Sequence, residues 1–255
     1  MIIEYQRPKT IPEALTLLAR ERPPSFPLGG GTYVNRKSDD QYAVIDFQDL
    51  KLDAITMQGN VLLVGATTTL QALADYQGLP KAMYTTINHE ATYNLRCMAT
   101  VAGTLVTSTG RSAFTTLMLA LDSSLEFLES EKKPIQVRLG DWLPVRLADK
   151  PNRLITKVSF PSNVKTAYES VSRTPADQPI VCAAVVQWPS GRTRLALGGW
   201  GKTPLLAMDG PEAQGIEVAA SSAYSQAEDE WASAEYRGEM ARVLARRCME
   251  RVTTK

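Results

Sequence analysis

The sequence contains few of the side chains that bind metal ions or form covalent cross-links. Its 255 residues include one histidine, His89, and three separated cysteines, Cys97, Cys182 and Cys248. Structural zinc sites and iron–sulfur clusters usually take four Cys or His ligands, so neither kind of metal site is expected within this chain. The scattered cysteines also argue against a disulfide framework and favour a reducing compartment, so we expect a cytoplasmic protein.

Hydrolase motifs, long apolar runs and excess charge are absent as well. His89 has no partner at metal-site spacing and no G-x-S-x-G motif is present, which disfavours a zinc or serine hydrolase. No apolar stretch approaches the roughly 18 residues of a transmembrane helix, and the N-terminus lacks a signal-peptide pattern. The net charge of +1 leaves no broad basic surface for nucleic acid or an anionic membrane. At 44% hydrophobic and 22% charged residues, the chain is typical of a globular protein with a sizeable core.

Two short Gly/Thr runs are the clearest local feature of the sequence. The first run is Leu28–Thr32 (LGGGT), and the second run is Thr100–Thr104 (TVAGT). Each run follows apolar or strand-like sequence and offers main-chain N–H groups with little side chain around them. Small residues let the backbone approach a diphosphate, which carries negative charge and many acceptor oxygens. Two such runs suggest a bulky cofactor held between two lobes.

Each run taken alone also has a simpler interpretation. Gly29–Gly31 could be a flexible turn, since it is neither a Walker A loop nor a G-x-G-x-x-G fingerprint. Thr100–Thr104 could be a small-residue strand edge that packs closely on another backbone. The local patterns leave both the phosphate-binding and the structural interpretation open.

Hydrophobic periodicity and turn signals divide the chain into three parts. Residues 1–53 predict a βαβ-like lobe, because strand patterns flank a helix that opens with the capping box Thr10–Glu13. Residues 54–162 predict a second lobe of strands and helices, and residues 163–255 predict a small C-terminal domain. This last part contains a β-hairpin and ends in a long helix. That helix is expected to have Tyr236, Met240, Leu244 and Arg247 near one stripe.

The individual elements follow from the same patterns. The expected strands are Ile2–Tyr5, Ala43–Phe47, Ala54–Gln58, Val61–Val64, Leu125–Leu128, Ile135–Leu139, Leu154–Phe160, Val181–Trp188 and Arg192–Gly198. Helices are expected after the capping residues Thr10, Thr69 and Ser112, around Pro80–Asn88, after Gly210-Pro211, and over Ser233–Arg251.

Taken in order, these segments resemble the FAD-binding medium subunit of the molybdenum hydroxylases, the carbon monoxide dehydrogenase and xanthine dehydrogenase family. The resemblance covers nearly the whole chain. Leu28–Thr32 is similar to the family's A-G-G-T loop, and Ala99–Gly103 is similar to its A-T-I-G-G loop. Further similar segments are Tyr5–Pro8 with Glu13–Leu15, Leu154–Thr156 with Phe160-Pro161, Ala167-Tyr168 with Ser172-Arg173 and Asp177, and Ser233–Arg237 with Val243–Arg247.

The resemblance implies an α+β fold, with a two-lobed FAD-binding domain of the vanillyl-alcohol-oxidase (PCMH) type and a small C-terminal domain with an antiparallel sheet. It implies that the two runs wrap the FAD diphosphate through main-chain N–H groups, that Tyr33 stacks near the cofactor, and that Ile155 contacts the isoalloxazine ring. It implies no catalytic side chain and no metal ligand. The implied cofactor-binding residues are Leu28, Gly29, Gly30, Gly31, Thr32, Tyr33, Thr100, Val101, Ala102, Gly103, Thr104, Thr109 and Ile155.

Several positions depart from the family pattern. Ala102 stands where the family has the first Gly of a pair, and a methyl group fits there only if φ is negative. Thr109 and Ala113 replace Asp residues that can bind FAD hydroxyls, and only Thr109 keeps a hydroxyl. Cys97 occupies a position that is often Asn. Glu169 stands where some members have Lys near the flavin, and its charge there would disfavour an anionic reduced flavin.

The implied function is that of the FAD subunit in a molybdenum hydroxylase-like oxidoreductase. A large partner subunit would carry a molybdenum cofactor, and a small partner subunit with two [2Fe-2S] clusters would pass electrons through FAD to an acceptor. The expected assembly is a heterotrimer, which could pair further into a dimer. Two alternatives remain: an assembly or scaffold subunit with weakened or lost FAD binding, and a stand-alone flavin reductase or oxidase.

Overall fold

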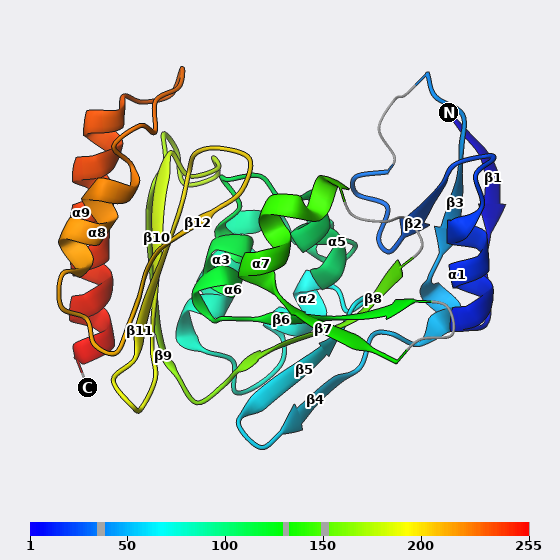
Figure 1. Cartoon of the computed structure of the whole chain (residues 1–255), viewed down its shortest axis with the longest axis horizontal. Helices are drawn as coiled ribbons and strands as arrows, with labels where there is room; N and C mark the ends of the chain where they lie inside the picture. The colour runs from blue at the N-terminus through cyan, green and yellow to red at the C-terminus, as the bar shows by residue number, and fades with distance from the viewer. Residues whose placement is uncertain (35–38, 130–132, 149–152, 255) are drawn as a thin grey trace. The chain divides into compact units, whose positions relative to one another are not determined.

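The computed structural model describes residues 1–34, 39–129, 133–148 and 153–254, and it mixes helices and strands along the chain (Figure 1). Tertiary contacts group the chain into two compact units, each built from segments that are not contiguous in sequence. Unit 1 comprises Met1–Asp75, Tyr93–Thr107 and Ser124–Ser159. Unit 2 comprises Tyr76–Thr92, Ser108–Ser123 and Phe160–Lys255. Segments from the middle of the sequence therefore complete the unit that contains the C-terminal sheet, and the sequence-based lobe boundaries stay a prediction.

The N-terminal part of unit 1 is a parallel three-stranded sheet of order β1–β3–β2. Helix α1 (Ile11–Ala19) connects β1 to β2, and the Thr10 side chain caps it by accepting the N–H of Glu13. The helix buries Ala14, Leu15 and Leu18. These features confirm the predicted βαβ-like arrangement. The strands are β1 (Ile2–Gln6), β2 (Ser25–Leu28) and β3 (Tyr42–Asp46).

The rest of unit 1 contains a five-stranded sheet of order β4–β5–β8–β6–β7. The pairs β4/β5, β6/β7 and β6/β8 are antiparallel, and Gly59 with φ 57° makes the turn of the first hairpin. The strands are β4 (Ile55–Gln58), β5 (Val61–Gly65), β6 (Ser124–Glu129), β7 (Ile135–Arg138) and β8 (Arg153–Pro161). The helices are α2 (Leu70–Ala74), α4 (Tyr93–Arg96), α5 (Val101–Thr107), α7 (Leu139–Trp142) and the 3-10 helices η1 (Gln48–Leu50) and η2 (Leu143–Ala148).

Unit 2 is a four-stranded antiparallel sheet, order β12–β11–β10–β9, with helices on both faces. Helices α8 and α9 pack on one face, and α3 and α6 pack on the other (Figure 1). Because both faces are covered, β10 is buried along nearly its whole length. The strands are β9 (Lys165–Val171), β10 (Val181–Gln187), β11 (Thr193–Gly198) and β12 (Leu205–Gly210). The helices are α3 (Lys81–Glu90), α6 (Ala113–Ala120), α8 (Ile216–Ala223) and α9 (Ala234–Thr253).

Every strand and helix expected from the sequence is present, with small differences at the ends. The side chains of Thr69 and Ser112 cap α2 and α6 as predicted. On the stripe named for the last helix, Leu244 is buried and Met240 is half-buried, whereas Tyr236 and Arg247 are exposed. The face of α9 that is buried contains Arg237, Gly238, Ala241, Leu244, Ala245, Cys248 and Val252. None of the described helices is long and apolar enough to cross a membrane.

Candidate functional site

The first Gly/Thr run leaves the N-terminal sheet at the end of β2. Leu28 is the last residue of that strand, and its carbonyl oxygen accepts the N–H of Phe47 at 3.1 Å. Gly31 then turns the chain with φ 72°, a conformation that glycine adopts without strain. Within the described ranges, the main-chain N–H groups of Gly29 through Thr32 donate no hydrogen bond to another part of the chain. These four consecutive residues therefore present free donors for an anionic group.

The resemblance suggests a loop for the second run, but in the structure this run begins helix α5. Thr100 forms an isolated bridge with Thr69, and the helix begins at the next residue. Ala102 lies inside this helix and is not among the residues with positive φ. Its backbone therefore has the negative φ that its methyl group requires. The helical start arises because the Thr100 side chain accepts the N–H of Gly103 at 3.2 Å, as a capping residue does.

Most of the N–H groups of the second run are used within the chain. The N–H of Val101 binds the Thr68 carbonyl at 2.8 Å, and that of Thr104 binds the Thr100 carbonyl at 2.8 Å. The N–H of Ala102 binds the carbonyl of Ala66 at 3.2 Å. Among the described residues, the N–H of Thr100 makes no such bond, so Thr100 is the free main-chain donor of this run. The two runs are thus unequal, because the first offers several free donors and the second offers few.

The two runs lie against each other within unit 1, and glycine is what permits the contact. A Cβ atom on Gly30 would lie 1.6 Å from the carbonyl oxygen of Met98, and one on Gly29 would lie 2.8 Å from Thr100 Oγ1. On the second run, a Cβ on Gly103 would lie 2.7 Å from the same Thr100 oxygen. The sequence pattern did not reveal the part that Met98 plays in this contact. The close approach brings the free donors of the first run beside Thr100.

The resemblance also implies three residues outside the two runs: Tyr33, Ile155 and Thr109. Tyr33 follows the first run and is 49% exposed. Ile155 is half-buried on β8, where its neighbours Leu154 and Thr156 point into the core. Thr109 belongs to unit 2, and its hydroxyl accepts the N–H of Arg111 at 3.3 Å.

Glu169, which departs from the family pattern, is paired inside unit 2. Its carboxylate lies 2.6 Å from the guanidinium of Arg251 on α9. The negative charge of Glu169 is therefore balanced by a neighbouring cation. Ala113, another departure, begins α6 and is buried, so its methyl group serves the packing of that helix.

The site has no charged side chain in either run. Residues Leu28–Tyr33 and Thr100–Thr104 contain no acidic or basic group, so an anion would be held by N–H dipoles and hydroxyls rather than by ion pairs. Within the described parts of the chain, no cluster of His, Cys, Asp and Glu residues could hold a metal ion. The free donors and the small residues fit the diphosphate of a dinucleotide cofactor.

Comparison with known proteins agrees with this fit. Residues 1–163 match a protein family described as the FAD binding domain in molybdopterin dehydrogenase. The chain belongs to this family. The match confirms the family resemblance and the FAD cofactor, and it makes the chain a flavoprotein component of an oxidoreductase.

Individual relatives extend the similarity over the full length. The chain is 28% identical to the uncharacterized protein YgfM of Escherichia coli K12 over 251 residues, covering 96% of this chain and 94% of YgfM. It is also 28% identical to the carbon monoxide dehydrogenase medium chain of Afipia carboxidovorans over 278 residues, which covers 97% and 96% of the two chains. A solved structure of carbon monoxide dehydrogenase from Oligotropha carboxidovorans is similar, with a TM-score of 0.82 and 25% identity over 98% of this chain and 96% of that chain. The predicted α+β fold class is therefore confirmed.

Proposed function

We propose that this chain is the electron-transfer subunit of a three-part molybdenum hydroxylase. A large partner subunit would carry the molybdenum cofactor that oxidises the substrate, and the assembly would work in the cytoplasm. FAD held by this chain would supply two-electron storage between two [2Fe-2S] clusters on a small partner and an acceptor. The name of the medium chain from Afipia carboxidovorans supports a place within a larger enzyme.

The observation that carries this proposal is the close contact of the two runs around free main-chain donors. Gly29, Gly30, Gly31 and Thr32 would donate their N–H groups to the FAD diphosphate, and the Thr32 hydroxyl would add another hydrogen bond. Thr100 would donate from the second run.

The other residues of the second run would act through their size. Ala102 and Gly103 keep the surface beside Thr100 small, since a Cβ on Gly103 would collide with the Thr100 side chain. Tyr33 and Ile155 would contact the rings of the cofactor. In this role the chain positions the cofactor and excludes water, and no side chain acts as a general acid or base.

Flavin binding to the purified chain tests the proposal. We expect an absorbance band at about 450 nm, the region where oxidised flavin absorbs, either as purified or after FAD is added. Gly30→Asp should abolish the band, because it adds bulk and negative charge beside the diphosphate. Gly59→Asp is the matched control, since a side chain at Gly59 meets nothing within 4 Å.

Co-expression with large and small subunits then tests the assembly. A flavin-loaded heterotrimer supports the proposal, and a colourless wild-type chain that gains no band with FAD contradicts it. A chain that co-purifies with a large subunit yet releases no flavin on denaturation would favour the scaffold alternative. Steady turnover by the isolated chain would favour a stand-alone flavin enzyme.

A further inference from the structure

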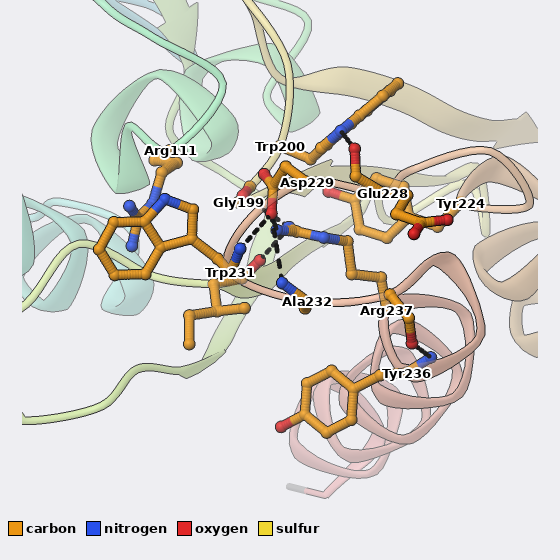
Figure 2. Close-up of polar contacts among 12 residues, drawn as sticks. Arg111, Gly199, Trp200, Tyr224, Glu228, Asp229, Trp231, Ala232, Tyr236 and Arg237 are labelled. Atoms are coloured by element: carbon orange, nitrogen blue, oxygen red, sulfur yellow. Dashed lines mark hydrogen bonds and ion pairs between the residues drawn. The ribbon is translucent and has the colours of Figure 1, made fainter.

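An exposed tryptophan of unit 2 is stacked against two arginines. Trp231 lies in the segment before α9 and is 38% exposed. The guanidinium carbons of Arg111 and Arg173 lie 4.4 and 4.5 Å from the centroid of its ring, within the range of cation–π contacts. Figure 2 shows Arg111 beside the Trp231 ring. Trp and Arg are among the residue types that contribute most to protein–protein binding energy.

The segment that contains Trp231 is held in place by an ion pair between Asp229 and the buried Arg237. The Asp229 carboxylate accepts the N–H of Trp231 at 2.8 Å and lies 2.5 Å from Nη2 of Arg237 (Figure 2). Arg237 is completely buried, and its Nη1 donates to the carbonyl oxygens of Ile180 at 2.7 Å and Gly199 at 2.8 Å. The tryptophan is therefore presented by an ordered backbone, which lowers the entropy lost when a partner binds.

Arg111, which lies just before α6, is also fixed in position. Arg111 donates from Nε to the carbonyl of Pro179 at 3.0 Å and from Nη2 to the carbonyl of Gln178 at 2.7 Å. These acceptors are neutral. Within the described ranges, neither Arg111 nor Arg173 forms an ion pair with a carboxylate of this chain.

The charges around Arg111 are mixed. Burial lowers the pKa of Arg111, and among its charged neighbours Asp229 has the largest effect and raises the pKa, Arg237 lowers it, Asp177 raises it and Arg173 lowers it. Asp229 is already paired with Arg237, and Asp177 accepts the N–H of Thr174. A carboxylate from outside the chain would form the direct ion pair that neither Arg111 nor Arg173 has within the described residues.

A second Trp–Arg stack in unit 2 differs in the ion pairing of its arginine. Arg192 stacks on Trp188 with its guanidinium carbon 4.7 Å from the ring centroid. Its Nη2 is also 2.9 Å from the Asp122 carboxylate and 2.8 Å from the Asp209 carboxylate. Arg192 is therefore ion-paired within the chain, whereas Arg111 and Arg173 form no direct ion pair among the described residues.

We propose that Trp231, Arg111 and Arg173 form a docking site for an acidic segment of a partner subunit. That the partner belongs to a multi-subunit dehydrogenase rests on the proposed function. A protein partner is favoured over a free anion, because exposed ion pairs alone contribute about 0–1 kcal/mol. A protein surface adds the apolar area around the tryptophan that a specific interface requires.

The test measures the affinity of the FAD-loaded full-length chain for the purified large–small subunit pair, at low and at high salt. Arg173→Glu and Trp231→Ala should each raise the Kd roughly tenfold or more, as expected for hot-spot residues. Arg173→Glu should also reduce the salt dependence of the Kd. Both variants should keep the flavin band and the wild-type circular dichroism. Arg246→Glu, the same change of charge on α9 at a side chain 50% exposed, should leave the Kd unchanged.

Each outcome bears on the inference. If the wild-type chain binds the pair and both variants bind it equally well, the docking site is wrong while the proposed function stands. Loss of affinity in Trp231→Ala without loss in Arg173→Glu overturns the acidic character of the partner. An equal loss in Arg246→Glu shows a general charge effect and also overturns the site. A wild-type chain that binds FAD but no subunit pair overturns both the docking site and the proposed assembly.

Discussion

Replacing Gly30 by alanine should weaken FAD binding through steric contact alone. The added Cβ would lie 1.6 Å from the Met98 carbonyl oxygen, and real Cβ atoms essentially never come within 3.0 Å of another heavy atom. One of the two backbones must therefore move by about 1.4 Å, the difference between these two distances. The change introduces no charge, so it isolates the contact between the runs from any electrostatic effect on the diphosphate.

The size of the effect follows from the cost of overpacking. Forcing an extra methyl group into a closely packed site typically costs about 1–3 kcal/mol. The free N–H groups lie on the segment that the added methyl group would displace, so the cost should appear in the FAD affinity. At about 1.4 kcal/mol per factor of ten, the dissociation constant should rise roughly 5- to 150-fold.

Isothermal titration of the apoprotein with FAD measures this change. Gly59→Ala is the control, because a Cβ at Gly59, which has a positive φ of 57° in its turn, meets nothing within 4 Å. We expect the control to lose some stability from backbone strain and to keep the wild-type FAD affinity. A folded Gly30→Ala chain with the dissociation constant of the wild type would show that the two runs do not close on the cofactor.

Three further substitutions test other parts of the structure. Removal from water raises the pKa of Glu90 above 4.5, despite hydrogen bonds from the start of α6. The folded chain therefore binds this proton more tightly, and the free energy of unfolding should fall as pH rises from 4.5 through the raised pKa. Urea unfolding across that window should show a smaller slope in Glu90→Gln, and equal slopes would contradict the assignment. Arg237→Met leaves the Asp229 carboxylate and two buried carbonyls without their donor, and should lower the free energy of unfolding by about 3–5 kcal/mol in a urea titration. Ala102→Gly should cost about 0.5–1 kcal/mol of stability, because the residue is helical, and calorimetry should find its FAD affinity unchanged.

The predicted elements were those whose signals are local. Thr10, Thr69 and Ser112 each cap the helix that follows, and each side chain accepts a nearby N–H. The Gly59 turn likewise specifies its hairpin, because glycine tolerates the positive φ that the turn requires. Such features depend on residues a few positions apart, so the sequence is sufficient to find them.

The strands β9 and β12 were missed because they lie at the two edges of their sheet. An edge strand is defined by the partner on one side, and its burial pattern depends on which helices cover it. The inner face of α9 was not predicted, for a related reason. Arg237 is completely buried because backbone carbonyls of distant segments and Asp229 accept its hydrogen bonds. Hydrophobic periodicity assigns such a residue to the surface.

In the candidate site, too, the sequence indicates some features and only the tertiary contacts decide the others. The composition of Leu28–Thr32 and Thr100–Thr104 suggested a diphosphate site because small residues let the backbone approach phosphate oxygens, but it left a purely structural interpretation of each run open. That the second run begins a helix depends on the carbonyls of Ala66 and Thr68, which take the N–H groups of Ala102 and Val101. The order of residues within the second run gives no information about where those two carbonyls lie.

By itself the sequence determined the capped helices, the hairpins, the family and the glycine-rich character of the candidate site. These follow from local backbone preferences and from residue types that are readable in order along the chain. Only the tertiary structure decided that Gly30 lies against Met98, that the first run keeps its donors free, and that Trp231 is stacked by arginines distant in sequence. Such contacts join segments whose separation along the chain carries no signal, so they become visible only when packing brings the segments together.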